Sequence, residues 1–323
     1  MTQLSVTRNG TPGVERKGRT VKGRTANAAS RTLWGDALRR LLKNRLAVIS
    51  FFWIVFVVRL ALSADLWVPQ VFGDPTLVDT NMTAQLSRLS PSPAHPFGTD
   101  SLGRDVFTRA LYGGRVSLSF ALVSIFFTFV IGLTLGGLSG YMGGLVDGLV
   151  QRTIDVIMSI PGIPLWMALA AALPKEMSSY TQYLLMCIIM SLIGWTGLAR
   201  VVRGKILSVR EEEFVTAARL SGATHKRVVF KHMLPMFMSY IIVSITGSIP
   251  ATILGETSLS FLGLGLQPPT ISWGTLLQDC QTVEAIAQQP WKMFPAAFIV
   301  VTVLMFNFAG DGLRDAADPY KQG

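Results

Sequence analysis

The sequence predicts an all-α protein that crosses a membrane about six times. Half of the 323 residues are hydrophobic and only 15% are charged, which is more apolar surface than one water-soluble core of this size normally buries. A helix needs about 20 mainly apolar residues to cross the hydrocarbon layer. Six stretches come near that length: residues 46–62, 116–138, 149–171, 183–201, 237–262 and 293–310.

The positive charge is concentrated where an even number of spans would place the cytoplasmic segments. Residues 8–45 hold eleven Lys or Arg against two acids, and residues 200–231 hold eight more. Residues 63–113 instead hold five Asp against three Arg. Because basic loops stay in the cytoplasm, both termini are expected inside, with segments 63–115, 174–182 and 263–292 outside. This placement accounts for the net charge of +10 without a nucleic-acid partner.

The chain before the first span divides into two parts. Residues 1–33 are basic and hold almost no large apolar side chain, so they are predicted to be a disordered cytoplasmic tail. In residues 34–45 a tryptophan and three leucines recur at helical spacing between basic residues, which predicts an amphipathic helix on the inner lipid surface. The alternative is a plain continuation of the first span. The first span and the outer loop follow in residues 46–115, where a cleaved signal ending near Ala64 is a second alternative.

A five-helix core is predicted over residues 116–310, followed by a cytoplasmic tail over 311–323. Four glycines recur every four residues and share one helix face, which lets another helix approach closely: Gly132, Gly136, Gly140 and Gly144. Prolines predict breaks where neighbours or water satisfy the freed carbonyls: Pro161, Pro164 and Pro250. Arg152 and Asp155, three apart on one helix, are expected to pair.

The segment between the fourth and fifth spans, residues 211–235, is the most informative part of the sequence. It predicts two short helices around a turn at Gly222, where glycine tolerates a positive φ, with Ser221 or Thr224 capping the second helix. Such a unit at the membrane surface suits the grip of a cytoplasmic partner, and a plain amphipathic connector is the alternative. The expected apolar sides are Phe214, Ala217, Ala218 and Leu220 in the first helix and Val228, Val229 and Met233 in the second.

This segment resembles the cytoplasmic coupling motif of binding-protein-dependent ABC importers. The motif has two alanines, a glycine four residues later and a later Leu-Pro pair, which match Ala217, Ala218, Gly222, Leu234 and Pro235. Thr216 stands where the family usually has Glu, which leaves Glu213 as the nearest acid. His232 stands where many members have Ile. The resemblance implies that the matching residues, with Glu213 and His232, couple the chain to an ATPase.

Further motifs resemble the dipeptide, oligopeptide and nickel permeases, in particular the second, C-type subunit of their permease pair. The motifs are HPFGTDSLGRD at 95–105, YGGRVSL at 112–118, RxxD with SIP at 152–161, ETSLSFLGLG at 256–265, and GDGLRD with DP at 310–319. They occur in the matching order and cover nearly everything from Arg39 onward. Several motifs in one order are more specific than a single motif.

The resemblance implies a type I ABC importer permease fold in a bacterial inner membrane, forming half of a translocation path for dipeptides or oligopeptides. The implied partners are a homologous second permease, two ABC ATPase subunits, an extracytoplasmic substrate-binding protein, the peptide and membrane lipids. The sequence holds no GxxxxGK[ST] phosphate loop. The chain is therefore expected to be non-catalytic and to bind no cofactor or metal, with ATP and Mg on the partner chains. The alternatives are the same complex importing nickel or another small solute, and an ion-gradient-driven secondary transporter.

Two groups of polar residues are further candidate site residues. Glu256 is an acid within an apolar span, where a charge is costly unless it faces water, a partner or the bundle interior. The working hypothesis places Glu256 and Ser260 on the translocation path, and a structural pairing of Glu256 is the alternative. In the outer loop, Asp100, Arg104 and Asp105 are expected to contact the binding protein or to form an ion-pair network with Arg115.

Overall fold

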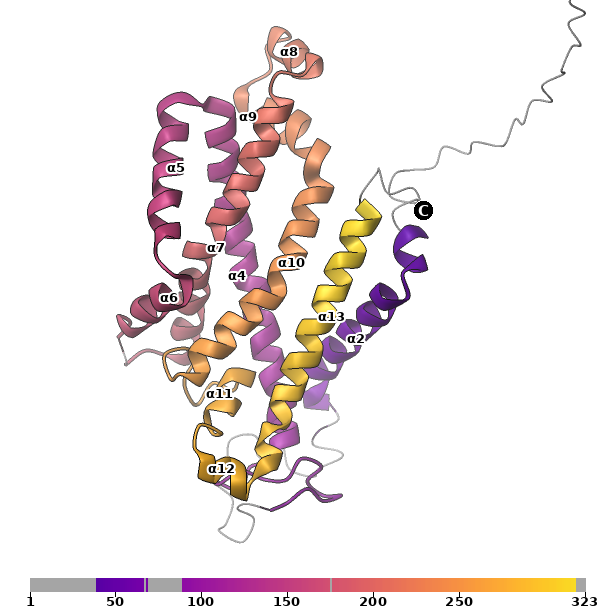
Figure 1. The fold of residues 1–323 in the computed structure, drawn as a ribbon, viewed down its shortest axis with the longest axis vertical. Helices are drawn as coiled ribbons and strands as arrows, with labels where there is room; N and C mark the ends of the chain where they lie inside the picture. Colours follow the sequence, from indigo (N-terminus) through magenta and orange to yellow (C-terminus); the bar gives the residue numbers. More distant parts are fainter. Residues whose placement is uncertain (1–38, 67, 69–88, 175, 318–323) are drawn as a thin grey trace, which may run out of the picture.

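A computed structural model describes residues 39–66, 68, 89–174 and 176–317, and most of these residues are helical (Figure 1). The longer helices are α2 (Arg45–Leu62), α4 (Val106–Met142), α5 (Gly144–Ser159), α6 (Gly162–Ala171), α7 (Ser179–Val209), α10 (Leu234–Phe261) and α13 (Phe294–Ala317). The shorter ones are α8 (Glu213–Leu220), α9 (His225–Arg227), η3 (Val228–Met233), α11 (Trp273–Gln278), α12 (Val283–Gln288) and η4 (Pro290–Met293). Across these described ranges there is no strand, only one bridge between Thr99 and Asp105. The predicted all-α fold class is confirmed.

Among the described residues, five helical runs are long and apolar enough to cross a membrane. They are α2, α4, α7, the run from α9 to α10 and the run from η4 to α13. The pair α5 and α6 meets the same criterion only together, with a bend of 89° between the two helices. If this pair is counted as one span, the described residues hold the six spans that the sequence predicts.

The third predicted span, residues 149–171, is broken rather than continuous. Ile160 is extended, with φ −98° and ψ 133°, and α6 begins directly after Pro161. The ring of a proline pushes the preceding residue out of the α region, so the break predicted at Pro161 is confirmed. The breaks predicted at Pro164 and Pro250 are wrong, because Pro164 lies inside α6 and Pro250 inside α10, where the residue with non-helical φ and ψ is Phe237.

α4 and α7 pack closely along the predicted glycine stripe. A Cβ added to Gly132 or Gly140 would come to about 3.0 Å from α7, and one added to Gly136 would overlap the backbone of Ala199. Larger residues would therefore push the two helices apart. The prediction is wrong for Gly144, because α4 ends two residues earlier and Gly144, with a φ of 55°, is the first residue of α5.

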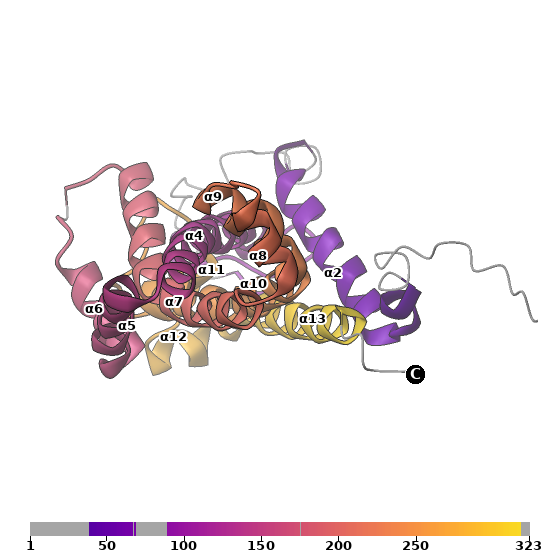
Figure 2. The same cartoon turned by 90° about the horizontal axis from the view of Figure 1, so that it is seen from above.

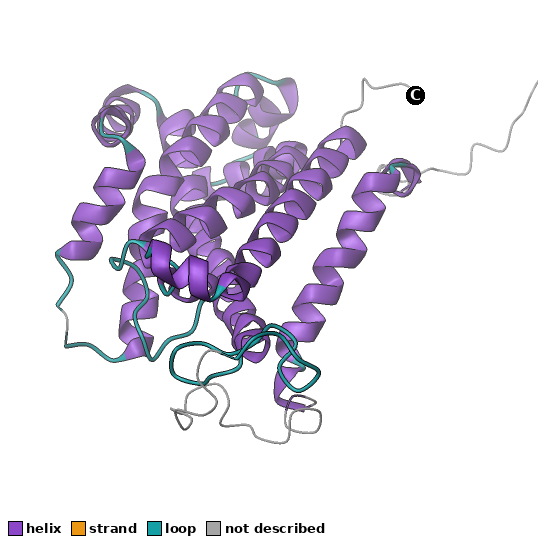
Figure 3. Cartoon of the chain, turned by 60° about the horizontal axis from the view of Figure 1, so that its bottom comes forward, coloured by secondary structure: helices purple, strands orange, loops and turns teal. Residues whose placement is uncertain are grey.

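α4 lies in the middle of the bundle, between two edges formed by different helix pairs (Figures 1 and 2). α2 and α13 form one edge, and α5 and α6 form the other. α8 caps one end of the bundle, which also holds the start of α2 and the end of α13, whereas α11 and α12 lie at the opposite end (Figure 1). We call these the α8 end and the α12 end. Loops gather at the α12 end, as Figure 3 shows.

Large apolar side chains remain exposed along the long helices. They include Phe51, Phe52 and Phe56 on α2, Leu122 and Phe126 on α4, and Met236, Ile242 and Leu254 on α10. Exposed apolar surface on this scale is rare on water-soluble proteins. These faces suit the hydrocarbon layer or a neighbouring membrane helix.

The first described residues show how the chain reaches the first span. Residues 39–43 are helical, but Asn44 leaves the helical region with ψ of 99°. Its side chain caps α2 by accepting a hydrogen bond from the backbone N–H of Ala47 at 3.2 Å. The helix before Asn44 is therefore not a plain continuation of α2. Residues 1–38, with the predicted tail and the start of the predicted interfacial helix, lie outside the described residues, as do residues 318–323.

Candidate functional site

Residues 211–235 form a compact helical segment that leads from α7 into α10 at the α8 end. α8 ends at a turn where Gly222 has a φ of +79°, a conformation that strongly favours glycine. The Thr224 side chain caps α9 by accepting a hydrogen bond from a backbone N–H three residues later. η3 then carries the chain into α10, whose first turn contains Pro235. The predicted helix–turn–helix is confirmed, and of the two predicted caps the structure selects Thr224 over Ser221.

An apolar cluster anchors this segment to α7. Val215 of α8 and both Val228 and Met233 of η3 are fully buried. They pack in one cluster with Val202 and Ile206 of α7. Burial of apolar surface stabilises the packed state by about 25 cal/mol per Å², and this stabilisation does not depend on the orientation of the groups in contact. The segment is therefore a folded unit attached to the end of α7.

The side of α8 that faces away from this cluster is exposed and partly apolar. Leu220 is 85% exposed and Phe214 37% exposed, and Ala217 is exposed too. The predicted apolar side of α8 omits Val215, which is the fully buried residue of this helix. Of the four predicted residues, Ala218 packs against the same cluster as Val215. Val215 and Ala218 are three residues apart, a spacing that places both on one helix face.

The other predicted coupling residues lie in two different environments. Leu234 is buried and belongs to the apolar cluster, whereas His232 is partly exposed in η3. Glu213 in the first turn of α8 and Pro235 at the start of α10 are exposed. An acid in the first turn of a helix is favoured by the helix dipole. Glu213 and Pro235 are accessible to a partner, and Leu234 supports the segment from inside.

A contact that sequence reasoning missed ties the segment to α4. The hydroxyl of Tyr141, at the end of α4, lies 2.9 Å from Nδ1 of His225. The guanidinium of Arg219 lies over the same ring, 5.0 Å from its centroid, at a distance where a cation and an aromatic face attract each other. Residues so far apart in the chain share no local spacing, so no sequence pattern indicates this contact.

Glu256 lies inside the bundle near the α12 end of α10. Its side chain is 1% exposed, and its carboxylate accepts hydrogen bonds from the hydroxyls of Ser117 at 3.1 Å and Ser260 at 2.9 Å. Ser260 is fully buried as well. In this conformation neither Glu256 nor Ser260 faces an open path. The contacts fit the alternative of a structural pairing, with two serine hydroxyls as the partners.

Two aspartates organise the loop before α4. Asp100 is 3% exposed and accepts hydrogen bonds from the backbone N–H of Arg104 at 2.9 Å and from its Nε at 2.7 Å. Asp105 is fully buried and caps α4 by accepting from the N–H of Thr108 at 2.7 Å, with Nδ1 of His95 3.1 Å from its other oxygen. These contacts correspond to the predicted local network rather than to an exposed docking surface.

Two predicted ion pairs are replaced by others. Arg115 lies 3.0 Å from Asp65 instead of joining the network of the loop before α4. Asp155 pairs with Arg200 of α7 at 2.5 Å rather than with Arg152 on its own helix. A pair three residues apart on a helix surface adds only about 0.2–0.5 kcal/mol. A basic residue from the facing helix α7 competes easily with a contact of that size.

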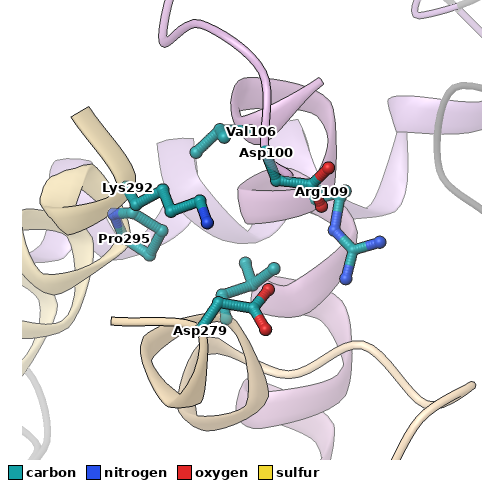
Figure 4. Close-up of a pocket in the computed structure, with 7 residues that line it drawn as sticks. Asp100, Val106, Arg109, Asp279, Lys292 and Pro295 are labelled. Carbon is teal, nitrogen blue, oxygen red and sulfur yellow. The ribbon is translucent and has the colours of Figure 1, made fainter. Parts of the chain in front are cut away.

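Four charged side chains converge at the α12 end (Figure 4). Asp100, Arg109 and Lys292 are more than nine-tenths buried, and Asp279 follows α11. Partial desolvation raises the pKa of the Asp279 carboxyl above its ordinary value although the side chain is 41% exposed, and nearby Arg109 opposes this rise. An adjoining recess of about 440 Å³ is lined in part by Arg104, Arg109 and Asp279. Charges of both signs compensate one another here. Within the described residues, no group of three or more His, Cys, Asp or Glu could hold a metal ion.

Comparison with known families shows what kind of protein carries these features. Residues 132–321 match the family described as binding-protein-dependent transport system inner membrane component. The chain belongs to this family. Residues 32–90 match the N-terminal TM domain of oligopeptide transport permease C, so the two matches together cover most of the chain.

Curated relatives of this permease family match over nearly its whole length. The oligopeptide transport system permease protein OppC of Bacillus subtilis (strain 168) is 36% identical over 291 residues, which is 90% of each chain. The dipeptide transport system permease protein DppC of the same organism is 38% identical over 286 residues, 88% of this chain and 85% of the relative. OppC of Haemophilus influenzae is 37% identical over 290 residues, 90% of this chain and 89% of the relative. The resemblance found in the sequence is confirmed, and the chain is a multi-pass membrane protein of a transport permease family.

Proposed function

We propose that this chain is one of two homologous permease subunits in an ATP-driven importer that carries dipeptides or oligopeptides across a bacterial inner membrane. The names of the relatives, which are oligopeptide and dipeptide permeases, support the substrate class. One structural observation carries the mechanism: residues 211–235 form a folded unit at the α8 end that presents exposed apolar side chains. The further partners are two ATPase subunits, an extracytoplasmic substrate-binding protein and the surrounding lipids.

The exposed side of α8 suits a protein partner. Leu220 and Phe214 offer apolar surface, and full burial of one such side chain is worth about 1.5–3 kcal/mol. Glu213 adds a negative charge at the edge of this surface. Beneath it, Val215 fixes α8 to the cluster on α7, so a partner that grips α8 also pulls on α7 and α10. ATP-driven closure of the partner then shifts the bundle between conformations through contacts that differ between them.

The distribution of charge supports an orientation for the bundle. The α8 end holds Lys226, Arg227 and Lys231, besides Arg39, Arg40 and Lys43 just before α2. Basic segments stay in the cytoplasm, so the α8 end and both termini are cytoplasmic in our proposal. The α12 end faces the outside, where a binding protein delivers the peptide. ATP and Mg belong to the partner chains, because the sequence holds no phosphate loop.

The test is co-purification of the ATPase chains with the tagged permease from gently solubilised membranes. Recovered chains are identified by mass spectrometry, and the eluate is assayed for ATP hydrolysis. Leu220→Asp places a charge on the exposed side of α8 and should lower ATPase recovery by about tenfold or more, as expected for an interface residue worth at least 1.4 kcal/mol.

Val283→Asp is the matched control. Val283 is 84% exposed, close to the 85% of Leu220, but it lies in α12 at the opposite end of the bundle. The control should leave ATPase recovery unchanged. Absence of ATPase chains from the wild-type preparation, with the bundle still folded, would contradict the importer and favour a transporter driven by an ion gradient.

A further inference from the structure

The segment between α10 and α11, residues 262–272, folds back over the end of the bundle and touches two helices. A Cβ added to Gly265 would come 2.5 Å from the backbone nitrogen of Ser260. One added to Gly274, in the first turn of α11, would come 2.7 Å from Cβ of the same serine, and one added to Gly113 of α4 would come 3.1 Å from Ser272. Only glycine permits such close backbone contact. The segment and α11 therefore lie directly against α10 and α4.

Glu256 stands at the centre of this contact and holds a hydroxyl on each side. Ser117 belongs to α4 and Ser260 to α10, and each donates its hydroxyl hydrogen to a different oxygen of the Glu256 carboxylate. All three side chains are buried, with at most 1% exposed. A serine oxygen that donates its hydrogen still has lone pairs with which to accept another hydrogen bond.

Each serine oxygen also accepts a hydrogen bond from a backbone N–H of residues 262–278. The N–H of Trp273, at the start of α11, donates to Ser117 Oγ at 3.1 Å. The N–H of Leu266 donates to Ser260 Oγ at 3.0 Å. The first N–H groups of a helix have no partner within the helix, and a buried N–H without a partner is costly. Glu256 therefore orients two hydroxyls that each hold one backbone group of the segment.

We propose that Glu256 is a positioning residue which, through Ser117 and Ser260, latches residues 262–278 across the α12 end, and that this latch must open for solute to pass. The anchoring itself follows from the contacts of this chain, whereas its use as a gate rests on the proposed importer function. Glu256 is the hub of the latch, and the two serines are its contacts with the segment.

Hydrogen bonds suit such a latch better than apolar packing would. Each bond is directional, so a small outward shift of the segment breaks both N–H contacts together. The hydroxyls and the carboxylate that are left can then be satisfied by water. Buried networks of this kind are stable only when every member has a partner, so removing one serine weakens the whole closed arrangement.

Cys280 is a natural reporter for the state of the segment. It lies two residues beyond α11, its side chain is 4% exposed, and burial raises the pKa of its thiol to about 11. A hidden, protonated thiol reacts slowly with maleimides, because the thiolate is the nucleophile. The chain has one other cysteine, Cys187, so Cys187→Ala leaves Cys280 as the sole thiol.

The experiment measures the rate at which N-ethylmaleimide labels Cys280 in the full-length Cys187→Ala protein in native membranes. Ser117→Ala and Ser260→Ala should each raise the rate at least about fivefold, since each removes two hydrogen bonds, one to Glu256 and one from a backbone N–H, and leaves that buried N–H unpaired. Glu256→Ala should raise it further, and Glu256→Gln should fall between, because its amide oxygen still accepts from one serine.

Ser191→Ala is the matched control. Ser191 is fully buried and donates only within α7, to the carbonyl of Ile188 at 2.7 Å, so its loss should leave labelling at the parental rate. If Ser117→Ala and Ser260→Ala label no faster than Ser191→Ala, the latch is wrong. The serine variants keep the test decisive even where Glu256→Ala does not fold. Labelling needs no ATPase partner, so its outcome is independent of the co-purification that tests the importer.

Discussion

The two ends of the bundle hold their protruding segments by different kinds of contact. At the α8 end, residues 211–235 rest on an apolar cluster centred on Val215 and α7. At the α12 end, the segment before α11 and the loop before α4 are held by buried polar groups, chiefly Glu256, Asp100 and Asp105. Apolar contact tolerates small rotations because it has no preferred direction, whereas a buried hydrogen bond is lost once its geometry changes.

This difference matches what each end is proposed to do. A segment that transmits a push must stay attached to α7 while it moves, and apolar packing permits that. A segment that closes a path must be either shut or open, and a directional network gives two distinct states. Substitutions at the α8 end should therefore weaken the attachment of residues 211–235 to α7. Substitutions at the α12 end should instead weaken the closed position of the segment before α11.

The largest expected effect comes from placing a charge beneath α8. Val215→Asp would bury a carboxylate in the apolar cluster, which should cost more than about 3 kcal/mol and undock α8. Limited proteolysis in detergent should then cut residues 211–235 much faster than in the wild type. Thr216→Asp alters the exposed neighbour and should leave the segment protected. Equal cutting of both variants would show that the cluster does not hold the segment.

A smaller effect is expected from the polar cap at the α12 end. Asp105→Ala removes the hydrogen bonds to the N–H of Thr108 and to His95, which should cost about 1–3 kcal/mol of folding free energy. The melting temperature in detergent, compared with that of the exposed-neighbour variant Ser101→Ala, measures this loss. A melting temperature equal to that of Ser101→Ala would show that the hydrogen bonds of Asp105 do not stabilise the α12 end.

The link between the α8 end and α4 should be weaker again. Tyr141→Phe loses the hydrogen bond to His225 but keeps the ring under Arg219, for a cost of about 0.5–1.5 kcal/mol. Amide hydrogen exchange in residues 219–228 should speed up modestly in Tyr141→Phe and more in Tyr141→Ala. Exchange that is the same in both variants as in the wild type would mean that the apolar cluster alone positions the segment.

The smallest expected effect depends on pH and concerns an exposed pair. The hydroxyl of Tyr112 and then the guanidinium of Arg115 lower the pKa of the Asp65 carboxyl below its ordinary value of 3.8. A lowered folded-state pKa stabilises the protein above the unfolded value, and the gain is lost as the pH falls through the folded one. The difference in melting temperature between wild type and Asp65→Asn should therefore be present at about pH 6 and shrink below about pH 4. A melting-temperature difference that grows as the pH falls would contradict a lowered pKa for Asp65 in the folded protein.

Local patterns in the sequence predicted most of the fold, because helix period and turn chemistry are local. The glycine stripe from Gly132 to Gly140 and the turn at Gly222 follow from spacing and from positive φ, and the structure confirms both. Two expectations from local spacing were wrong. Gly144 is the first residue of α5, beyond the end of α4, and Pro250 lies inside α10 without breaking it.

The partners of the polar residues could not be predicted, because packing brings them together from distant parts of the chain. Glu256 meets Ser117, which is 139 residues away, and Asp155 meets Arg200 rather than its near neighbour. The sequence marked Glu256 as unusual from its surroundings, but nothing in its spacing identified α4 as the source of a donor. The coupling roles of Glu213, Ala217 and Gly222 stay predictions until a partner is identified.

The most direct test of the central claim is site-specific photo-crosslinking in intact membranes. A photoreactive amino acid in place of Leu220 should crosslink to an ATPase chain that mass spectrometry identifies. The same residue in place of Val283, equally exposed at the α12 end, should give no ATPase product. Crosslinks to an ATPase from Val283, or none from Leu220 while the complex remains assembled, would contradict the coupling role of the α8 end.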